Sequence, residues 1–108
     1  TGDYDPGGYS EFIRVPGINV ESGVYILPEH LSFAEATMIE PLACALRGQR
    51  VIDVKRGQVV LVLGSGVSGL LNILVAGLDG AKVIATDVDP YRLKKAKECG
   101  ADEVLHAK

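Results

Sequence analysis

One stretch of the sequence constrains the fold of the whole chain. Five consecutive apolar residues, 59–63, run directly into a glycine-rich turn at residues 64–69. An uninterrupted apolar run of this length predicts a strand covered on both faces, as in a parallel sheet. The turn has the form G-x-G-x-x-G, in which the first glycine permits a sharp bend and the second lets a pyrophosphate approach the backbone. The third lets the next helix lie close to the strand.

The residues that follow the turn continue this pattern. An apolar segment predicts a helix packed on a sheet, and Asp87 stands at the carboxyl end of the next expected strand, 23 residues after Gly64. Gly100 is placed as the C-cap of a later helix. The expected elements after the turn are a helix at 70–76, a strand at 82–86, a helix at 90–98 and a strand that begins at 103. This order predicts the first half of an α/β, doubly wound parallel sheet of Rossmann type.

A short glycine pattern alone is weak evidence, but its context predicts a dinucleotide site. The amino end of the expected helix offers unpaired amides near Val67 and Ser68 to a pyrophosphate. Asp87 is expected to accept hydrogen bonds from the adenosine ribose and to repel a 2′-phosphate, which favours NAD over NADP. Arg92 is interpreted either as a ribose or adenine contact or as an exposed helix charge. The alternatives for the turn and Asp87 are a tight βαβ turn without ligand and a solvated carboxylate.

The amino-terminal third predicts different structure. Residues 1–8 are expected to be irregular, and residues 9–15 and 23–27 predict two strands. Residues 32–35, Ser-Phe-Ala-Glu, form a capping box that predicts a helix to about Ile39. Pro41 suits the first position of a further helix that ends near Val54.

Composition sets limits on the class of protein. The chain has 108 residues, a net charge of −3 and no basic cluster, so neither nucleic acid nor an anionic membrane surface is expected as a partner. No stretch of about 18 apolar residues is present, so a membrane span is not expected. Two cysteines, Cys44 and Cys99, do not suggest a disulfide framework, which favours a cytoplasmic setting.

Several motifs together resemble the zinc-dependent medium-chain dehydrogenase/reductases, with the closest similarity to the sorbitol (polyol) dehydrogenase branch. They are residues 7–12, GGYSEF; residues 24–28, VYILP; residues 32–36, SFAEA; residues 40–45, EPLACA; and the glycine-rich turn. The resemblance covers essentially the whole chain. It implies the end of a GroES-like catalytic domain at 1–31, a helical crossing segment at 32–54 and the first half of an NAD-binding Rossmann domain at 55–108.

The resemblance also implies site residues and chemistry. Glu40 matches a position beside the catalytic zinc, although it also suits an ordinary acid in the first turn of a helix. The implied reaction moves hydride between an alcohol or polyol and NAD, in a homodimer or homotetramer. The residues expected to bind the cofactor are Gly64, Gly66, Val67, Ser68, Gly69, Asp87 and Arg92.

Catalysis by these residues alone is not expected. The Cys and His that bind zinc in the family have no match in this sequence, and a catalytic zinc takes three protein ligands. His30 and His106 are interpreted as exposed side chains. Cys44, one helical turn after Glu40, is interpreted either as facing the nicotinamide region or, as is more common, as a buried helical residue. Two alternatives to a dehydrogenase segment therefore remain: a catalytically inert NAD-binding module, and a structural fragment that self-associates through an apolar sheet edge.

Overall fold

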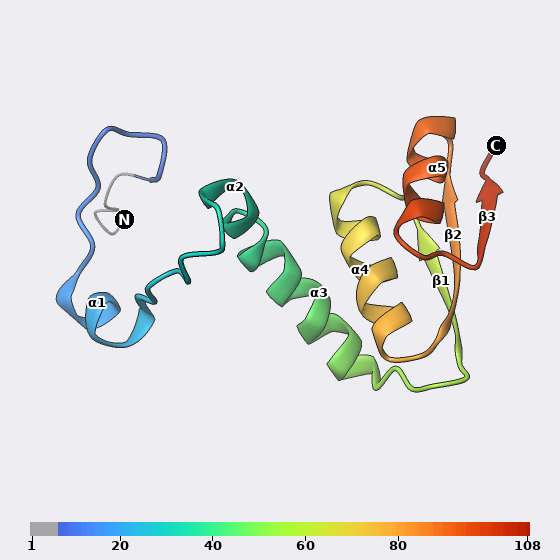
Figure 1. The fold of residues 1–108 in the computed structure, drawn as a ribbon, viewed down its shortest axis with the longest axis horizontal. Helices are drawn as coiled ribbons and strands as arrows, with labels where there is room; N and C mark the ends of the chain where they lie inside the picture. The colour runs from blue at the N-terminus through green and yellow to red at the C-terminus, as the bar shows by residue number, and fades with distance from the viewer. Residues whose placement is uncertain (1–6) are drawn as a thin grey trace, which may run out of the picture. The chain divides into compact units, whose positions relative to one another are not determined.

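The computed structural model describes residues 7–108. The chain divides into two compact units, Thr1–Ser32 and Phe33–Lys108 (Figure 1). Most of the irregular lead-in expected at residues 1–8 lies outside the described residues. The assignment of segments 1–31, 32–54 and 55–108 to three functional parts stays a prediction.

The first unit contains one short helix, α1 (Gly17–Gly23), and no strand among residues 7–32. Pro16 precedes this helix in an extended conformation, and its carbonyl accepts the amides of Asn19 and Val20 at 2.9 and 3.1 Å. The strands expected at 9–15 and 23–27 are therefore wrong in this structure. An alternating pattern forms a strand only against a partner, and the described residues of this unit supply none. The side chains of Tyr9 and Phe12 are instead fully exposed.

The second unit is an α/β arrangement, as predicted (Figure 1). Five of its elements agree closely with the sequence-based expectations. Among the described residues, no helix has the length and apolar character needed to cross a membrane. The elements are α2 (Phe33–Ala36), α3 (Ile39–Ile52), β1 (Val59–Leu63), α4 (Val67–Leu78), β2 (Lys82–Asp87), α5 (Pro90–Glu98) and β3 (Glu103–His106).

The two helices before the sheet have other boundaries than expected. The helix expected to run from the capping box to Ile39 ends at Ala36, and α3 already begins at Ile39. Pro41 is thus the third residue of α3 and not the first. The position still suits proline, because the first four amides of a helix have no partner within it. α3 ends at Ile52, and its C-cap residue Asp53 adopts a left-handed conformation with φ 56°.

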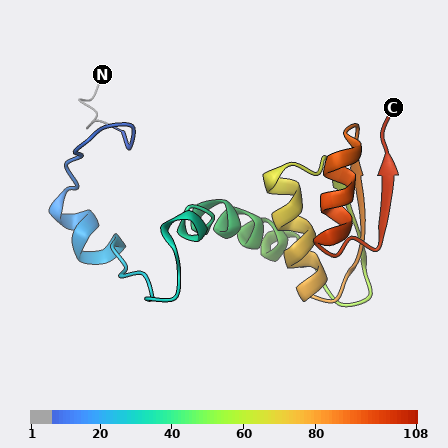
Figure 2. The ribbon, with the colours of Figure 1, turned by 45° about the horizontal axis from the view of Figure 1, so that its top comes forward.

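The sheet is parallel and has the order β1-β2-β3. Leu63 pairs with Thr86, and Asp87 pairs with His106, so the carboxyl ends of β1 and β2 lie side by side. Figures 1 and 2 show α4 and α5 on the same face of the sheet. The core lies between these two helices and the sheet. Its buried members are Val62, Ile73, Ala76, Ala81, Val83, Ala85, Ala96 and Ala101.

The other face of the sheet is bare within the described residues. Val59, Leu61 and Leu63 of β1 are 62%, 56% and 78% exposed, whereas Val62 on the opposite side is buried. The expectation that β1 is covered on both faces is therefore wrong for this chain. Both crossover helices fall on one face because the strands are added in one direction with right-handed connections. β1 also stands at the edge of the three-stranded sheet.

Candidate cofactor-binding site

The three glycines of the turn differ in what they make possible. Gly64 has φ +87°, a conformation that side-chain-bearing residues rarely adopt. A Cβ on Gly69 would lie 2.0 Å from the Gly64 carbonyl oxygen, so only glycine lets α4 pack this closely on β1. A Cβ on Gly66 would meet no atom within 4 Å. The structure thus explains Gly64 and Gly69 by the fold, and leaves open space in front of Gly66.

The amino end of α4 faces this turn. Gly66 is the N-cap residue and brings no side chain to cap the helix, while its carbonyl accepts the amide of Leu70 at 2.8 Å. The amides of Val67, Ser68 and Gly69 have no partner within the helix, as in the first turn of any α-helix. Free amides and the positive end of the helix dipole together suit an anion such as a pyrophosphate.

The Asp87 carboxylate ties this turn to the end of β2. Its Oδ2 accepts the Ser65 amide at 2.7 Å, and the side chain is only 4% exposed. The turn is held at two more points, because the Gly64 amide and the Ser65 hydroxyl both donate to the Thr86 carbonyl, at 2.9 and 3.1 Å. This role of Asp87 was not predicted from the sequence. The spacing of the two strands predicts that Asp87 lies beside the turn. It does not predict which backbone amide donates a hydrogen bond to the carboxylate.

The hydrogen bonds of Asp87 also set its charge. The Ser65 amide, followed by the Asp89 amide at 2.9 Å from Oδ1, lowers the pKa of Asp87 below its ordinary value, and burial only partly opposes this. The group is therefore ionised at neutral pH. A carboxylate offers about four acceptor positions, and two of them are occupied by these amides. The Val88 amide also lowers the pKa of Asp87, and only 4% of the side chain is exposed, so a further donor such as a ribose hydroxyl has to approach through this small exposed part.

Arg92 lies at the same end of β2. Its Nη1 is 3.9 Å from Asp87 Oδ2, and its Nε is 3.9 Å from Asp89 Oδ2. The Arg92 side chain is 55% exposed, so part of the guanidinium remains accessible. The structure places Arg92 near Asp87. A contact of Arg92 with ribose or adenine stays a prediction.

Glu40 lies in the first turn of α3 and lines a cleft together with residues of α4. The Cys44 thiol donates to Glu40 Oε1 at 3.1 Å, and this bond, with the charge of Glu40, raises the pKa of Cys44. Cys44 is exposed, so its interpretation as a buried residue is wrong. The cleft has a volume of about 390 Å³ and is lined by Glu40, Pro41, Cys44, Ala45, Gly48, Ser68 and Asn72.

The described residues do not fit a catalytic zinc by themselves. Within residues 7–108, no three His, Cys, Asp or Glu side chains gather closely enough to hold a metal ion. His106 is exposed at the end of β3, and His30 belongs to the other unit. Glu40 and Cys44 supply two possible ligands, whereas a catalytic zinc takes three from the protein. No step through zinc can be assigned to these residues.

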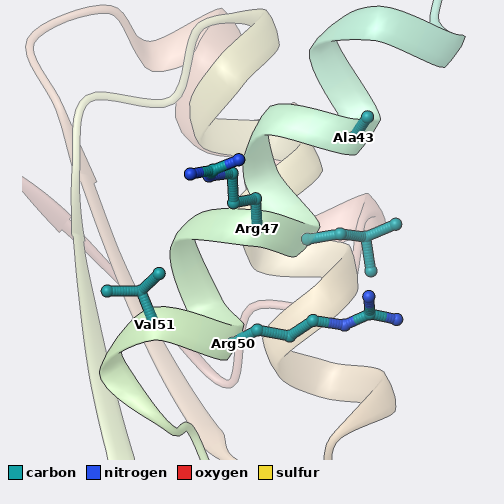
Figure 3. A pocket seen from close by; sticks show the side chains of 5 residues that line it. Ala43, Arg47, Arg50 and Val51 are labelled. Atoms are coloured by element: carbon teal, nitrogen blue, oxygen red, sulfur yellow. The ribbon is translucent and has the colours of Figure 1, made fainter.

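A second groove of about 390 Å³ runs along α3 and contains none of the predicted site residues. Figure 3 shows Arg47 and Arg50 extending from the helix in different directions, with Ala43 and Val51 beside them. The groove has two cations and an apolar floor, but no nucleophile, acid or acceptor. The glycine-rich turn therefore remains the candidate site.

Comparison with known proteins shows which family this chain resembles. The family model described as alanine dehydrogenase/PNT, C-terminal domain, matches residues 37–108. Sorbitol dehydrogenase of Ovis aries is 44% identical over 82 residues, which make up 75% of this chain and 23% of that protein. The chain thus spans about a quarter of the length of such curated relatives.

Solved structures resemble the chain in the same way. A short chain alcohol dehydrogenase from E. coli CFT073, complexed with NADH, has a TM-score of 0.72 and 34% identity, and covers 78% of this chain and 26% of that one. A zinc-binding dehydrogenase from Sinorhizobium meliloti 1021, bound to NADP, has a TM-score of 0.71 and 36% identity. The match covers 73% of this chain and 23% of that one.

Proposed function

This chain belongs to the alanine dehydrogenase/PNT C-terminal domain family, and from that premise we propose that it forms the first half of the NAD-binding domain of an alcohol or polyol dehydrogenase. The resemblance to zinc-dependent medium-chain dehydrogenases is confirmed by the sorbitol dehydrogenase and zinc-binding dehydrogenase relatives. The activity, substrate and subunit partners of the whole protein are part of the proposal. We infer a small alcohol or polyol substrate, a homodimer or homotetramer, and a cytoplasmic location.

The observation that carries the proposal is the geometry of the glycine-rich turn. Gly66 leaves open space beside the amino end of α4, where the amides of Val67 and Ser68 suit a pyrophosphate. Gly64 and Gly69 hold the helix against the strand at this point, and Asp87 lies at the end of the neighbouring strand. The folded chain itself has room for alanine at Gly66, so its packing does not require glycine there, whereas the approach of a pyrophosphate to the backbone would.

The cofactor supplies hydride chemistry, and the residues of this chain bind and orient it. In the proposal, the amides of the first α4 turn bind the pyrophosphate, and Asp87 accepts the adenosine ribose hydroxyls. Zinc is proposed for the whole protein, with most of its ligands outside this chain and Glu40 beside it. The position of Glu40 supports the proposal that it lies near the zinc, because Glu40 lines the same cleft as Ser68 of the proposed cofactor site.

Glu40→Ala in the whole protein tests the metal assignment. We expect turnover or bound zinc, measured by elemental analysis, to fall more than NAD⁺ affinity, because Glu40 is proposed to face the zinc and not the cofactor phosphates. Glu98→Ala serves as the control, since it removes a carboxylate of α5 that pairs with Lys95 and does not line this cleft. Unchanged turnover and zinc content in Glu40→Ala would return Glu40 to an ordinary acid of the first helical turn.

The choice of NAD over NADP rests on Asp87. Its pKa is lowered, so a negative charge stands where the 2′-phosphate of NADP would approach. The Sinorhizobium relative was solved with NADP, so the family likeness alone does not decide between the two cofactors. The side chain at this position carries that part of the proposal.

Asp87→Ser in the whole protein tests the cofactor preference. We expect NAD⁺ to bind about tenfold more weakly and the discrimination against NADP⁺ to fall, because a charge-assisted hydrogen bond and a repulsive charge are both lost. Dissociation constants for the two cofactors measure the effect. Glu103→Gln is a control that removes an exposed carboxylate from the next strand. A discrimination ratio unchanged by Asp87→Ser would contradict the assignment.

A further inference from the structure

Asp89 lies beside the proposed ribose site, and no role for it was predicted from the sequence. It is the N-cap residue of α5, and its Oδ1 accepts the Tyr91 amide at 2.8 Å. Its other oxygen, Oδ2, lies 3.9 Å from Arg92 Nε. The same guanidinium places Nη1 3.9 Å from Asp87 Oδ2. Arg92 therefore lies between two carboxylates that come from β2 and from the start of α5.

This arrangement affects how Arg92 meets a cofactor. An arginine near the ribose can accommodate the 2′-phosphate of NADP, because its guanidinium pairs with phosphate oxygens. Here two carboxylates compete for that guanidinium, and together the three groups carry a net charge of −1. Without Asp89, the remaining pair of Asp87 and Arg92 is neutral, and the Nε edge of Arg92 is free to meet a phosphate.

We propose that Asp89 is a positioning residue that sets cofactor choice by holding Arg92 and neutralising it, so that Arg92 does not recruit the 2′-phosphate of NADP. This inference rests on the proposed function of the site. It differs from the role of Asp87, which repels the phosphate directly, because Asp89 acts through Arg92. The half-exposed guanidinium keeps enough freedom to turn toward a phosphate once the Asp89 carboxylate is removed.

Asp89→Ser separates this role from helix capping. Serine and aspartate are both strong N-cap residues, so the bond to the Tyr91 amide is retained while the charge beside Arg92 is lost. The double variant Asp89→Ser/Arg92→Gln removes the guanidinium as well. Glu98→Gln is the matched control, since it removes one carboxylate from α5 that pairs with Lys95.

The experiment measures dissociation constants of NAD⁺ and NADP⁺ for the whole protein and these variants by titration calorimetry. We expect Asp89→Ser to bind NADP⁺ about two- to fivefold more tightly, the range for one exposed charge pair, and to change NAD⁺ affinity by less than about twofold. The double variant should lose the gain, and Glu98→Gln should behave as the parent protein. A structural role for Asp89 would weaken both cofactors equally.

Three results would overturn the inference. NAD⁺ binding with an unchanged NADP⁺ to NAD⁺ ratio in Asp89→Ser would contradict it and leave the proposed function intact. A gain that persists in the double variant would show that the substitution at Asp89 acts on the phosphate without Arg92, through the lost charge or the introduced hydroxyl. Failure of the parent protein to bind either cofactor would instead contradict the proposed function, and this inference with it.

Discussion

At the scale of single residues, the account depends on Asp87, which lies where the glycine-rich turn meets the end of β2. Its place after the second strand could be predicted from the sequence, because the acidic residue follows the strand at the spacing typical of dinucleotide sites. Its bond to the Ser65 amide could not, since the direction of that amide is set by the conformation of the turn. The sequence likewise predicted that Arg92 lies at the site. Its position between the carboxylates of Asp87 and Asp89 depends on the fold and was not predicted.

The lowered pKa of Asp87 predicts a pH dependence of stability. A group whose pKa is lower in the folded than in the unfolded chain adds stability above its ordinary value, 3.8, and loses it as the pH falls through the lowered value. The free energy of unfolding should therefore fall below about pH 4 by more in the parent chain than in Asp87→Asn. Urea unfolding followed by circular dichroism between pH 3 and 6 measures the difference.

Asp79→Asn is the control for this prediction, because Asp79 is an exposed carboxylate that follows α4. Its unfolding free energy should follow that of the parent chain across the pH range. If Asp87→Asn and the parent chain lose stability in parallel below pH 4, folding does not lower the pKa of Asp87.

At the scale of the elements, prediction succeeded where local signals agree with packing. The elements from β1 to β3 were predicted in type and order, because their apolar runs are bounded by Gly, Asp and Pro, although α4 begins three residues earlier and ends two residues later than expected. The strands expected at 9–15 and 23–27 failed because their pattern specifies a face and not a partner. The boundary between α2 and α3 was misplaced because a capping box and a proline each indicate a helix start, and α3 begins between them.

The packing of α4 on β1 predicts different effects for two glycines of one turn. Gly69→Ala should lower the free energy of unfolding by about 1–3 kcal/mol, the usual cost of overpacking, since the new Cβ would overlap the Gly64 carbonyl. Gly66→Ala meets no atom of the chain, so its stability loss should be limited to the capping preference, about 1 kcal/mol or less. It should still weaken NAD⁺ binding, because the methyl group would occupy the space proposed for the pyrophosphate.

Thermal unfolding and NAD⁺ titration of both variants measure these effects, and each variant is the control for the other. Equal stability losses in Gly66→Ala and Gly69→Ala would contradict the packing argument. Unweakened NAD⁺ binding in a folded Gly66→Ala variant would contradict the proposed position of the pyrophosphate.

At the scale of the whole molecule, the sheet is half covered. One face holds the core under α4 and α5, and the other exposes Leu61 and Leu63 of β1 among the described residues. The sequence predicted a central strand because five apolar residues suit burial on both faces, which requires cover that these residues do not provide. The bare face fits both a segment of a larger dehydrogenase and the structural alternative, in which apolar edges associate. Binding of the cofactor distinguishes the two.

The most direct test of NAD⁺ binding at the glycine-rich turn is a titration of the 108-residue chain with NAD⁺. The chemical shifts of the backbone amides are the readout. The account predicts shifts gathered at the glycine-rich turn, residues 64–69, and around Asp87 and Arg92. Shifts confined to the α3 groove at Arg47 and Arg50, or no shifts at millimolar NAD⁺ in a folded chain, would contradict it.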